Sequence, residues 1–222
     1  STSLTVAVSG GLGTLHYEWV KDGTEVLAGD NPWFDISPAA LDDAGAYFVN
    51  VWDERANPIQ SNTAVIKVGE RLQIVDAPIG VDTAMYTGEA PFPMMVQVLG
   101  GVGSINFQWK QQTPGAKAIV NVGANTPALT LDPTKPSDTG IYWCEVSDEW
   151  DSFVGGNTDP LKSNTVSLKV ADHMAFTLQP QNAAKYRDDA HTFRAVVTGG
   201  MNTVHYTWKK DDLALPNSDA NT

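Results

Sequence analysis

The sequence has very little cysteine and little positive charge. Cys144 is the single cysteine among 222 residues, so no disulfide can form within the chain. Lys and Arg total 14 against 26 Asp and Glu, which leaves a net charge of −12. Nucleic-acid binding needs clustered Lys and Arg, and docking on an anionic membrane needs a basic segment. The charge balance excludes both kinds of partner.

Long apolar runs and helical patterns are also missing. No stretch approaches the roughly 18 consecutive apolar residues of a membrane span, so we expect no membrane insertion. No segment places apolar residues on one face at the 3.6-residue spacing of a helix. Hydrophobic residues nevertheless make up 42% and charged residues 18%, which is too apolar for a disordered tail. The chain should therefore fold, and fold without helices.

The sequence does contain an internal repeat. Trp19, Trp109 and Trp208 each follow a Gly-Gly pair, and the first glycine lies 9 positions before the tryptophan in all three cases. The tryptophans are 90 and 99 residues apart. Such a period is the length of a domain rather than of a solenoid repeat.

Two further blocks recur once each. Residues 32–47, which begin at a proline and end at a tyrosine, match residues 127–142 without a gap. Residues 61–68, beginning Ser-Asn-Thr and ending Lys-Val, match residues 163–170. The repeat therefore extends over most of the chain.

Within the repeats, apolar residues recur at every second position. Val6 and Val8 show this period of two, as do Tyr47, Val49 and Val51. Alternation of this kind buries one face of a β-sheet and leaves the other toward water or a partner. Short strands separated by Gly-Gly, Asp-Gly and Asn-Pro turns favour an all-β sandwich or barrel.

The segments Asp43–Val49 and Asp138–Cys144 resemble the Asp-x-Gly-x-Tyr-x-Cys signature of immunoglobulin domains. The resemblance implies tandem immunoglobulin-like Greek-key β-sandwiches, with Tyr47 and Tyr142 at a tyrosine corner and the repeated tryptophans in the core. It also implies that the family's first disulfide cysteine is replaced in every repeat, by Val6, Val96 and Ala195. The second falls on Val49 and Cys144, so the bridge is absent throughout.

The phase of the repeat predicts three domains. Residues 1–68 would form a domain that lacks strand A, 72–170 a complete domain, and 174–222 a partial domain with strands A to C. A partial sandwich cannot cover its own apolar face. We therefore expect either neighbouring immunoglobulin-like domains of a longer array or partner chains that complete the ends.

No combination of residues indicates catalysis or a cofactor. Cys144 should point into the core as an inert thiol. Carboxylates gather at Asp53–Glu54, at Asp148–Asp151 and between Asp76 and Asp82. None of these clusters has the spacing of a calcium loop, so we expect a solvated acidic rim and no metal site.

Outward aromatic residues form the candidate binding site. Phe48 and Trp52 in the first repeat and Trp143 in the second should lie on the outer face of a strand. Exposed rings can stack on sugars or pack on another protein. The alternative is that side chains of neighbouring strands or a neighbouring domain cover them. The loop that contains residues 155–160 is longer than its counterpart, as expected of a recognition loop or of a tolerated insertion.

The missing disulfide bears on function, because animal immunoglobulin domains usually retain it. The segments 163–170 and 206–212 resemble the immunoglobulin-like outer-capsid decoration proteins of tailed phages. We therefore expect a displayed, non-enzymatic module on a virion surface or outside a cell, with host-surface proteins or glycans as partners. The alternatives are a repeat of a bacterial cell-surface adhesin or filament and an accessory module of a secreted glycan-active enzyme.

Overall fold

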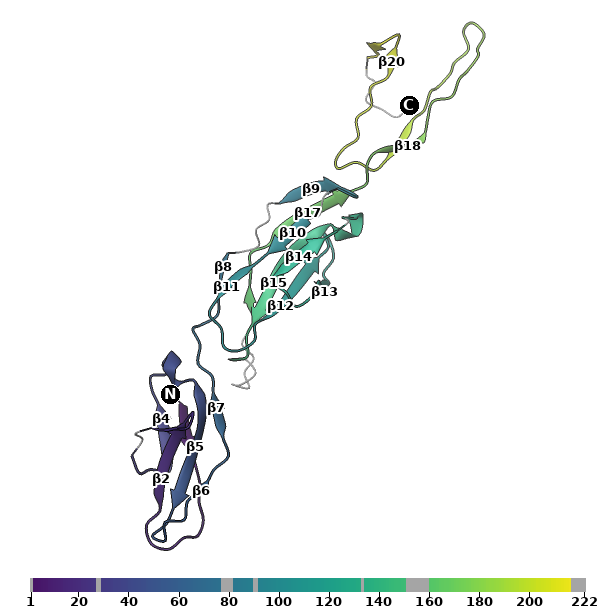
Figure 1. Ribbon diagram of the computed structural model, residues 1–222. Helices are drawn as coiled ribbons and strands as arrows, with labels where there is room; N and C mark the ends of the chain where they lie inside the picture. The colour runs from purple at the N-terminus through teal and green to yellow at the C-terminus, as the bar shows by residue number, and fades with distance from the viewer. Residues whose placement is uncertain are drawn as a thin grey trace. The chain divides into compact units, whose positions relative to one another are not determined.

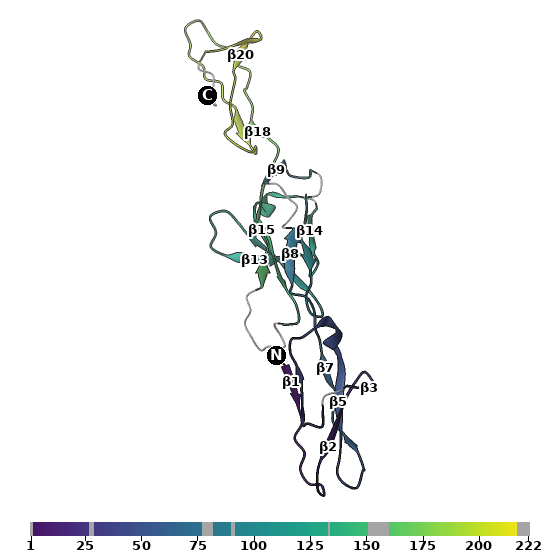
Figure 2. The ribbon, with the colours of Figure 1, turned by 90° about the vertical axis from the view of Figure 1, so that its left-hand side faces the viewer.

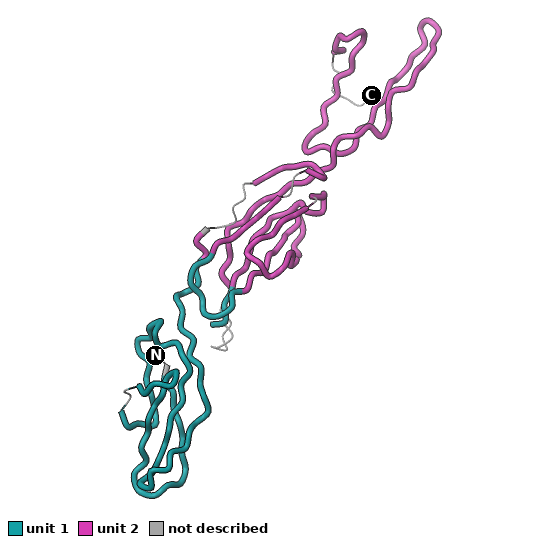
Figure 3. Tube along the Cα trace, in the orientation of Figure 1, with its two compact units in different colours: residues 1–73, 98–105, 147–159 teal, residues 74–97, 106–146, 160–222 magenta. Residues whose placement is uncertain are grey.

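The regular secondary structure of the computed structural model is almost entirely β-strand (Figure 1). It describes residues 2–26, 29–76, 82–89, 92–132, 134–150 and 160–216. Backbone contacts divide the chain into two compact units, shown in Figure 3: residues 1–73, 98–105 and 147–159, and residues 74–97, 106–146 and 160–222. We call residues 1–68, 72–170 and 174–222 the first, second and third repeats. As domain boundaries, these ranges stay a prediction.

The first repeat folds into two small sheets. Its strands are β1 (Thr2–Thr5), β2 (His16–Lys21), β3 (Thr24–Glu25), β4 (Trp33–Ile36), β5 (Gly45–Trp52), β6 (Ile59–Gln60) and β7 (Ala64–Ile66). The order β3-β2-β5-β6, with β7 also on β5, forms one sheet, and β1 pairs with β4 in the other. The turned view in Figure 2 shows β1 to one side of β2, β5 and β7. Trp19, Val49 and Val51 form the buried centre, against which Leu4 and Phe34 pack from the second sheet.

The second repeat has the fuller set of strands. They are β8 (Gln73–Asp76), β9 (Thr83–Tyr86), β10 (Phe92–Met95), β11 (Gln97–Leu99), β12 (Asn106–Gln112), β13 (Ile119–Val122), β14 (Ala128–Leu131), β15 (Gly140–Ser147), β16 (Leu161–Lys162) and β17 (Val166–Ala171). The main sheet runs β13-β12-β15-β17-β9, with β16 also on β15. Its β9–β17 pairing is parallel, and the pairings of β15 with β16 and β17 are antiparallel. β10 pairs with β14 and β11 with β8, which supplies the facing strands.

The third repeat is described as two short pairs of strands. Its strands are β18 (Ala175–Leu178), β19 (Val196–Thr198), β20 (Lys209–Lys210) and β21 (Leu213–Ala214). β18 pairs with β19 and β20 with β21, both antiparallel. All four residues of β18 are exposed.

A tyrosine hydroxyl ties the start of β5 and of β15 to the preceding turn. Tyr47 Oη donates to the Asp43 carbonyl at 2.8 Å, and Tyr142 Oη donates to the Asp138 carbonyl at 2.6 Å. The two acceptors end the short 3-10 helices η1 (Leu41–Asp43) and η2 (Pro136–Asp138). Both rings are almost fully buried. Burial raises the pKa of both phenols, so the hydroxyls stay protonated donors. The predicted tyrosine corner is confirmed.

The repeated tryptophans fill the two sandwiches. Trp19 is 4% exposed and Trp109 is 0% exposed. Each indole nitrogen donates at 3.1 Å to a loop carbonyl, that of Asn31 in the first repeat and that of Thr126 in the second. A buried indole N–H without an acceptor would cost free energy, so these bonds permit the burial. Both tryptophans lie in the core as predicted.

A serine fastens the strand position that would carry the family's second cysteine. Ser61 Oγ accepts the amide of Val49 at 3.0 Å, and the Ser61 amide donates back to the Val49 carbonyl at 2.9 Å. Ser163 makes the same two bonds with Cys144, both at 2.9 Å. Both serines begin the repeated Ser-Asn-Thr motif. Reciprocal hydrogen bonds therefore hold Ser61 beside β5 and Ser163 beside β15, within the same sheet.

Replacing Trp109 should destabilise the second repeat strongly. Loss of a fully buried indole should lower the free energy of unfolding by about 3–5 kcal/mol for Trp109→Ala, because it removes apolar burial and leaves a cavity. Urea unfolding followed by circular dichroism measures this change. Trp150→Ala is the control, since Trp150 is 51% exposed and its loss should change stability by less than about 0.5 kcal/mol. Equal effects of the two substitutions would contradict the core assignment.

Candidate functional site

Phe48 and Trp52 lie on the outer face of the main sheet in the first repeat. Their neighbours across β2 are Val20 and His16, respectively. The His16 and Trp52 rings stack with their centroids 5.7 Å apart. Phe48 and Trp52 are both half-buried. The outward placement of these two rings follows the prediction, although neighbouring side chains cover part of each.

Polar groups frame the Trp52 ring. Asn50 and Glu18 lie between the Phe48–Val20 pair and the Trp52–His16 pair. Asn50 Nδ2 donates to Glu18 Oε2 at 2.8 Å. The Asp30 carboxylate forms a hydrogen bond of 2.6 Å with His16 Nδ1 and accepts the Tyr17 amide at 2.6 Å. These hydrogen bonds lower the pKa of Asp30, so it stays ionised at neutral pH. The face therefore offers a stacked ring pair flanked by carboxylates, which suits sugar or protein contact.

Trp143 does not present an open ring, and the prediction that it is exposed is wrong. Its side chain is only 4% exposed. Lys162 Nζ lies 4.2 Å from the ring centroid, and the indole nitrogen donates to Glu145 Oε1 at 3.2 Å. Lys110 Nζ in turn forms an ion pair of 3.1 Å with Glu145 Oε2. Long charged side chains of neighbouring strands thus cover the ring, and strand alternation cannot reveal such cover.

The carboxylates after β5 and β15 serve as backbone acceptors. Asp53 accepts the amides of Leu12 and Arg55, both at 2.9 Å. Asp148 accepts the amides of Val102 at 2.8 Å and Trp150 at 3.0 Å. The hydrogen bonds to Asp53, first that from Leu12, lower its pKa. Each carboxylate therefore fastens the loop that follows a Gly-Gly pair.

The remaining acidic positions offer no metal centre in the part of the chain that the structure describes. No group of three or more His, Cys, Asp or Glu side chains comes together there. Asp82 accepts the amide of Ser167 at 2.9 Å. Residues 77–81 and 151–159, which include most of the candidate recognition loop, lie outside the described residues. Within the described ranges, no helix has the length and apolar character that a membrane crossing needs.

Glu149, which lies after β15, takes part in an ion pair. Its carboxylate pairs with Lys67 Nζ and accepts the Ser104 amide at 3.0 Å. The hydrogen bond from Lys67, followed by that from Ser104, lowers the pKa of Glu149 from its ordinary 4.5 to about 2. All three residues lie in the first compact unit.

Cys144 is a core side chain with 0% exposure. Burial in apolar surroundings disfavours the thiolate and raises the pKa of Cys144 to about 11. The thiolate is the reactive form of cysteine, so this thiol is poorly placed to act as a nucleophile or metal ligand. The predicted buried thiol is confirmed.

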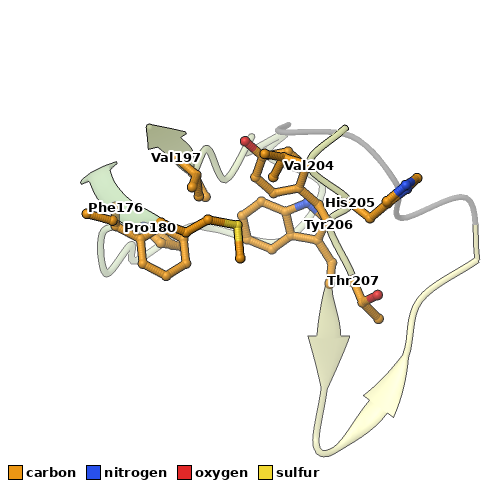
Figure 4. A pocket seen from close by; sticks show the side chains of 11 residues that line it. Phe176, Pro180, Val197, Val204, His205, Tyr206 and Thr207 are labelled. Atoms are coloured by element: carbon orange, nitrogen blue, oxygen red, sulfur yellow. The ribbon is translucent and has the colours of Figure 1, made fainter. Parts of the chain in front are cut away.

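The third repeat contains an apolar groove of about 310 Å³ (Figure 4). Phe176, Val197 and Tyr206 line it together with Trp208. Trp208 is half-buried, whereas the equivalent Trp109 is fully buried. In the first repeat, Val49 and Val51 of β5 cover the matching face. The groove therefore corresponds to the inner face of a sandwich, and its residues have the chemistry of a core.

Comparison with known proteins supports the fold. No protein-family model matches the chain. Over 66 residues it is 33% identical to the decoration protein of Escherichia phage T5, covering 30% of this chain and 40% of that protein. Over 198 residues it is 22% identical to Fc receptor-like protein 2 of Homo sapiens, covering 86% of this chain and 37% of that protein. The chain thus spans less than half the length of either curated relative.

The chain also matches solved structures of tandem immunoglobulin domains. The match to an I-band fragment of titin covers 94% of this chain and 73% of the titin chain, with a TM-score of 0.51 at 16% identity. A similarity at this identity speaks to the fold alone. The fold is that of tandem immunoglobulin-like β-sandwiches, as the resemblance in the sequence predicted.

Cys144 should resist modification while the chain is folded. Zero exposure and a pKa of about 11 leave almost no accessible thiolate at pH 8. A thiol-reactive chromogenic disulfide should therefore label the native chain far more slowly than the chain unfolded in guanidinium chloride, which serves as the control. Labelling at the same rate in both states would contradict the buried position.

The Glu149 contact should weaken in acid. Because its pKa is lower in the folded than in the unfolded chain, this carboxylate favours folding above about pH 4.5 and loses that contribution as the pH falls toward about 2. An NMR titration should give Glu149 a pKa of about 2, and Lys67→Gln should raise it toward the ordinary value. An unchanged pKa in the variant would mean that Lys67 does not hold the carboxylate.

Proposed function

We propose that the chain is a non-enzymatic structural and adhesive module displayed on the surface of a tailed-phage virion. The observation that carries the proposal is the repeated immunoglobulin-like sandwich closed without a disulfide. The chain has a single cysteine, so neither sandwich needs an oxidising compartment to form an intrachain bridge, and the fold can form in a reducing cytoplasm before display. The partial identity to a phage decoration protein supports this setting.

The chemistry of the described residues favours binding over catalysis. The buried thiol of Cys144 is protonated at neutral pH, and Asp53 and Asp148 accept backbone amides in loops. A general base or nucleophile needs an accessible group beside a substrate pocket. The groove of the third repeat is lined mainly by apolar and aromatic side chains. These features suit a module that binds and spaces rather than one that turns over a substrate.

The face around Trp52 is the proposed contact surface for a host protein or glycan. The ring stacks on His16, and Glu18 and Asn50 provide hydrogen-bonding groups on the same face. Aromatic platforms flanked by polar groups are common in sugar and protein recognition. Phe48 extends the apolar part of this surface along β5.

Immunogold electron microscopy tests the setting. An antibody raised against the chain would be applied to density-purified virions and to cell envelopes from the same native culture. The proposal expects label on the virions. Label confined to the cell envelopes would instead indicate a bacterial surface adhesin, and label on neither would overturn display altogether.

Trp52→Ala should weaken binding to the target surface about tenfold, the effect of losing a moderate hot-spot residue of about 1.4 kcal/mol. Binding to host cells or to an array of surface glycans measures it, and the thermal midpoint checks that the variant is folded. Trp33→Ala is the matched control, because Trp33 is 47% exposed and lies on β4 of the other sheet. Equal loss in both variants would contradict a contact at Trp52.

A further inference from the structure

The acidic residues of the chain are unevenly distributed. None lies among the 42 residues between Glu89 and Asp132, so all 26 fall in the other 180 residues. We call residues 90–131 the acid-free segment. It contains the strands β10 to β14 of the second repeat and two positive charges, Lys110 and Lys117. Although the chain has a net charge of −12, another acidic chain can approach this segment without meeting like charges on it.

The acid-free segment includes an edge strand. The main sheet of the second repeat ends at β13, which pairs with β12 alone among the described strands. Figures 1 and 2 show β13 at the margin of the second repeat. In the sequence, β13 lies between β12 and β14, and both of these strands are placed within the second repeat. The position of β13 at the sheet edge is therefore set by this repeat itself.

β13 lacks the features that usually prevent an edge strand from pairing. Edge strands are normally protected by a charge, a proline, a bulge or a very short length. The four residues Ile119–Val122 include no charged residue and no proline, and their register with β12 runs without a shift. Ile119 is 52% exposed and Val120 is 48% exposed. An exposed, uncharged strand rich in β-branched residues is open to pairing with another strand.

The equivalent strand of the first repeat is protected. There, β3 follows β2 as β13 follows β12, but it is only two residues long, Thr24–Glu25. Both residues are exposed, so Glu25 places a carboxylate at this edge. The first repeat therefore follows the usual rule for edge strands, and the second repeat departs from it.

Hydrogen bonds fix the chain on both sides of β13. Before the strand, Gln112 Nε2 donates to the Ala116 carbonyl at 3.2 Å. After the strand, Asn125 Oδ1 accepts the Phe107 amide at 2.7 Å. β13 is therefore held in its extended form before any partner binds, which reduces the conformational entropy lost on pairing.

The uncharged edge fits a second copy of the same chain. A two-fold axis places β13 antiparallel to β13 of the other copy, and such a pairing needs no other complementary surface. The residues that face each other across this pair are isoleucine, valine and asparagine, so no like charges are opposed. On the adjacent strand, Lys110 is already paired with Glu145 at 3.1 Å. A strongly charged partner would find no row of opposite charges on β13, whereas a copy of β13 meets its own equivalent.

We propose that two copies of the chain associate through β13, in an antiparallel strand pair that joins their main sheets edge to edge. We call this contact the β13 interface. Backbone hydrogen bonds hold the pair, and Ile119 and Val120 pack across the axis. Four residues from each copy bury less area than a standard interface, so we expect a weak dimer with a dissociation constant of about 0.1 mM. The β13 interface belongs to a different repeat from the Trp52 face and does not depend on display on a virion.

Dilution of the isotope-labelled 222-residue chain tests the β13 interface. Between about 1 mM and about 0.02 mM, sedimentation equilibrium should show a dimer converting to a monomer. The amide NMR shifts of Ile119 and Val120 should change over the same range. A chain that is monomeric at about 1 mM, or a dimer whose concentration-dependent shifts lie outside residues 113–127, would overturn the proposal.

Substitutions on two strands locate the contact. Val120→Lys and Ile119→Lys each place like charges near the two-fold axis and should weaken association about tenfold or more. Val65→Lys is the matched control, because Val65 is a strand valine of the first repeat with 61% exposure, and association should be unchanged. The thermal midpoint shows whether each variant is folded. Undiminished association of the folded β13 variants, or loss in Val65→Lys alone, would overturn the β13 interface.

Salt distinguishes the pairing of uncharged edges from the docking of lysines on an acidic surface. Two chains that each have a net charge of −12 repel one another, and salt screens this repulsion. Raising sodium chloride from about 0.02 M to about 0.3 M should therefore tighten the dimer about two- to fivefold. A dimer that weakens over this range would mean that Lys110 or Lys117 binds carboxylates of the other copy, and would overturn the pairing of uncharged strands.

Discussion

Enclosure of one tryptophan between two sheets is the constraint on which each sandwich depends. An indole ring buries a large apolar area only if strands from both sheets close over it and a carbonyl accepts its N–H. Trp19 and Trp109 meet both conditions through loop carbonyls at matching positions. The tyrosine corner and the serine link then fix β5 and β15 against their neighbours. Because the chain has a single cysteine, these noncovalent contacts hold each sandwich without an intrachain bridge.

The core was predictable from the sequence because burial imposes a period of two on each strand. Val49 and Val51 alternate with the outward-facing Phe48, Asn50 and Trp52, and the Asp-x-Gly-x-Tyr motif places Tyr47 at its corner. Whether neighbouring side chains cover a residue on the outer face follows no such period. Whether Trp143 is open depends on where Lys162 and Glu145 extend, and long flexible side chains leave no spacing signal. The exposure of this ring therefore could not be predicted.

The sequence analysis also missed contacts made by the backbone. Ser61 and Ser163 stand in a repeated motif, so their recurrence was a usable signal, but their link to Val49 and Cys144 required the strand register. The Gly-Gly pairs indicate turns, but the sequence carries no signal that Gly101 and Gly200 also donate backbone hydrogen bonds to the segment before each repeat.

Acidic side chains contribute to this architecture mainly by fixing the conformation of loops. Asp53 and Asp148 accept loop amides, and Glu149 pairs with Lys67, so part of the net charge of −12 fastens loops. The remaining surface charge repels other acidic surfaces. The proposed contact surface is the face where the Trp52 ring stacks on His16.

Native-state hydrogen exchange of the chain under reducing conditions tests most directly whether the noncovalent core alone holds the fold. The account predicts the slowest exchange at the amides of Val49 and Val51 in β5 and of Cys144 and Val146 in β15, which surround the buried tryptophans. Rapid exchange of these amides in reducing buffer, with protection appearing only after oxidation of Cys144 between chains, would contradict it.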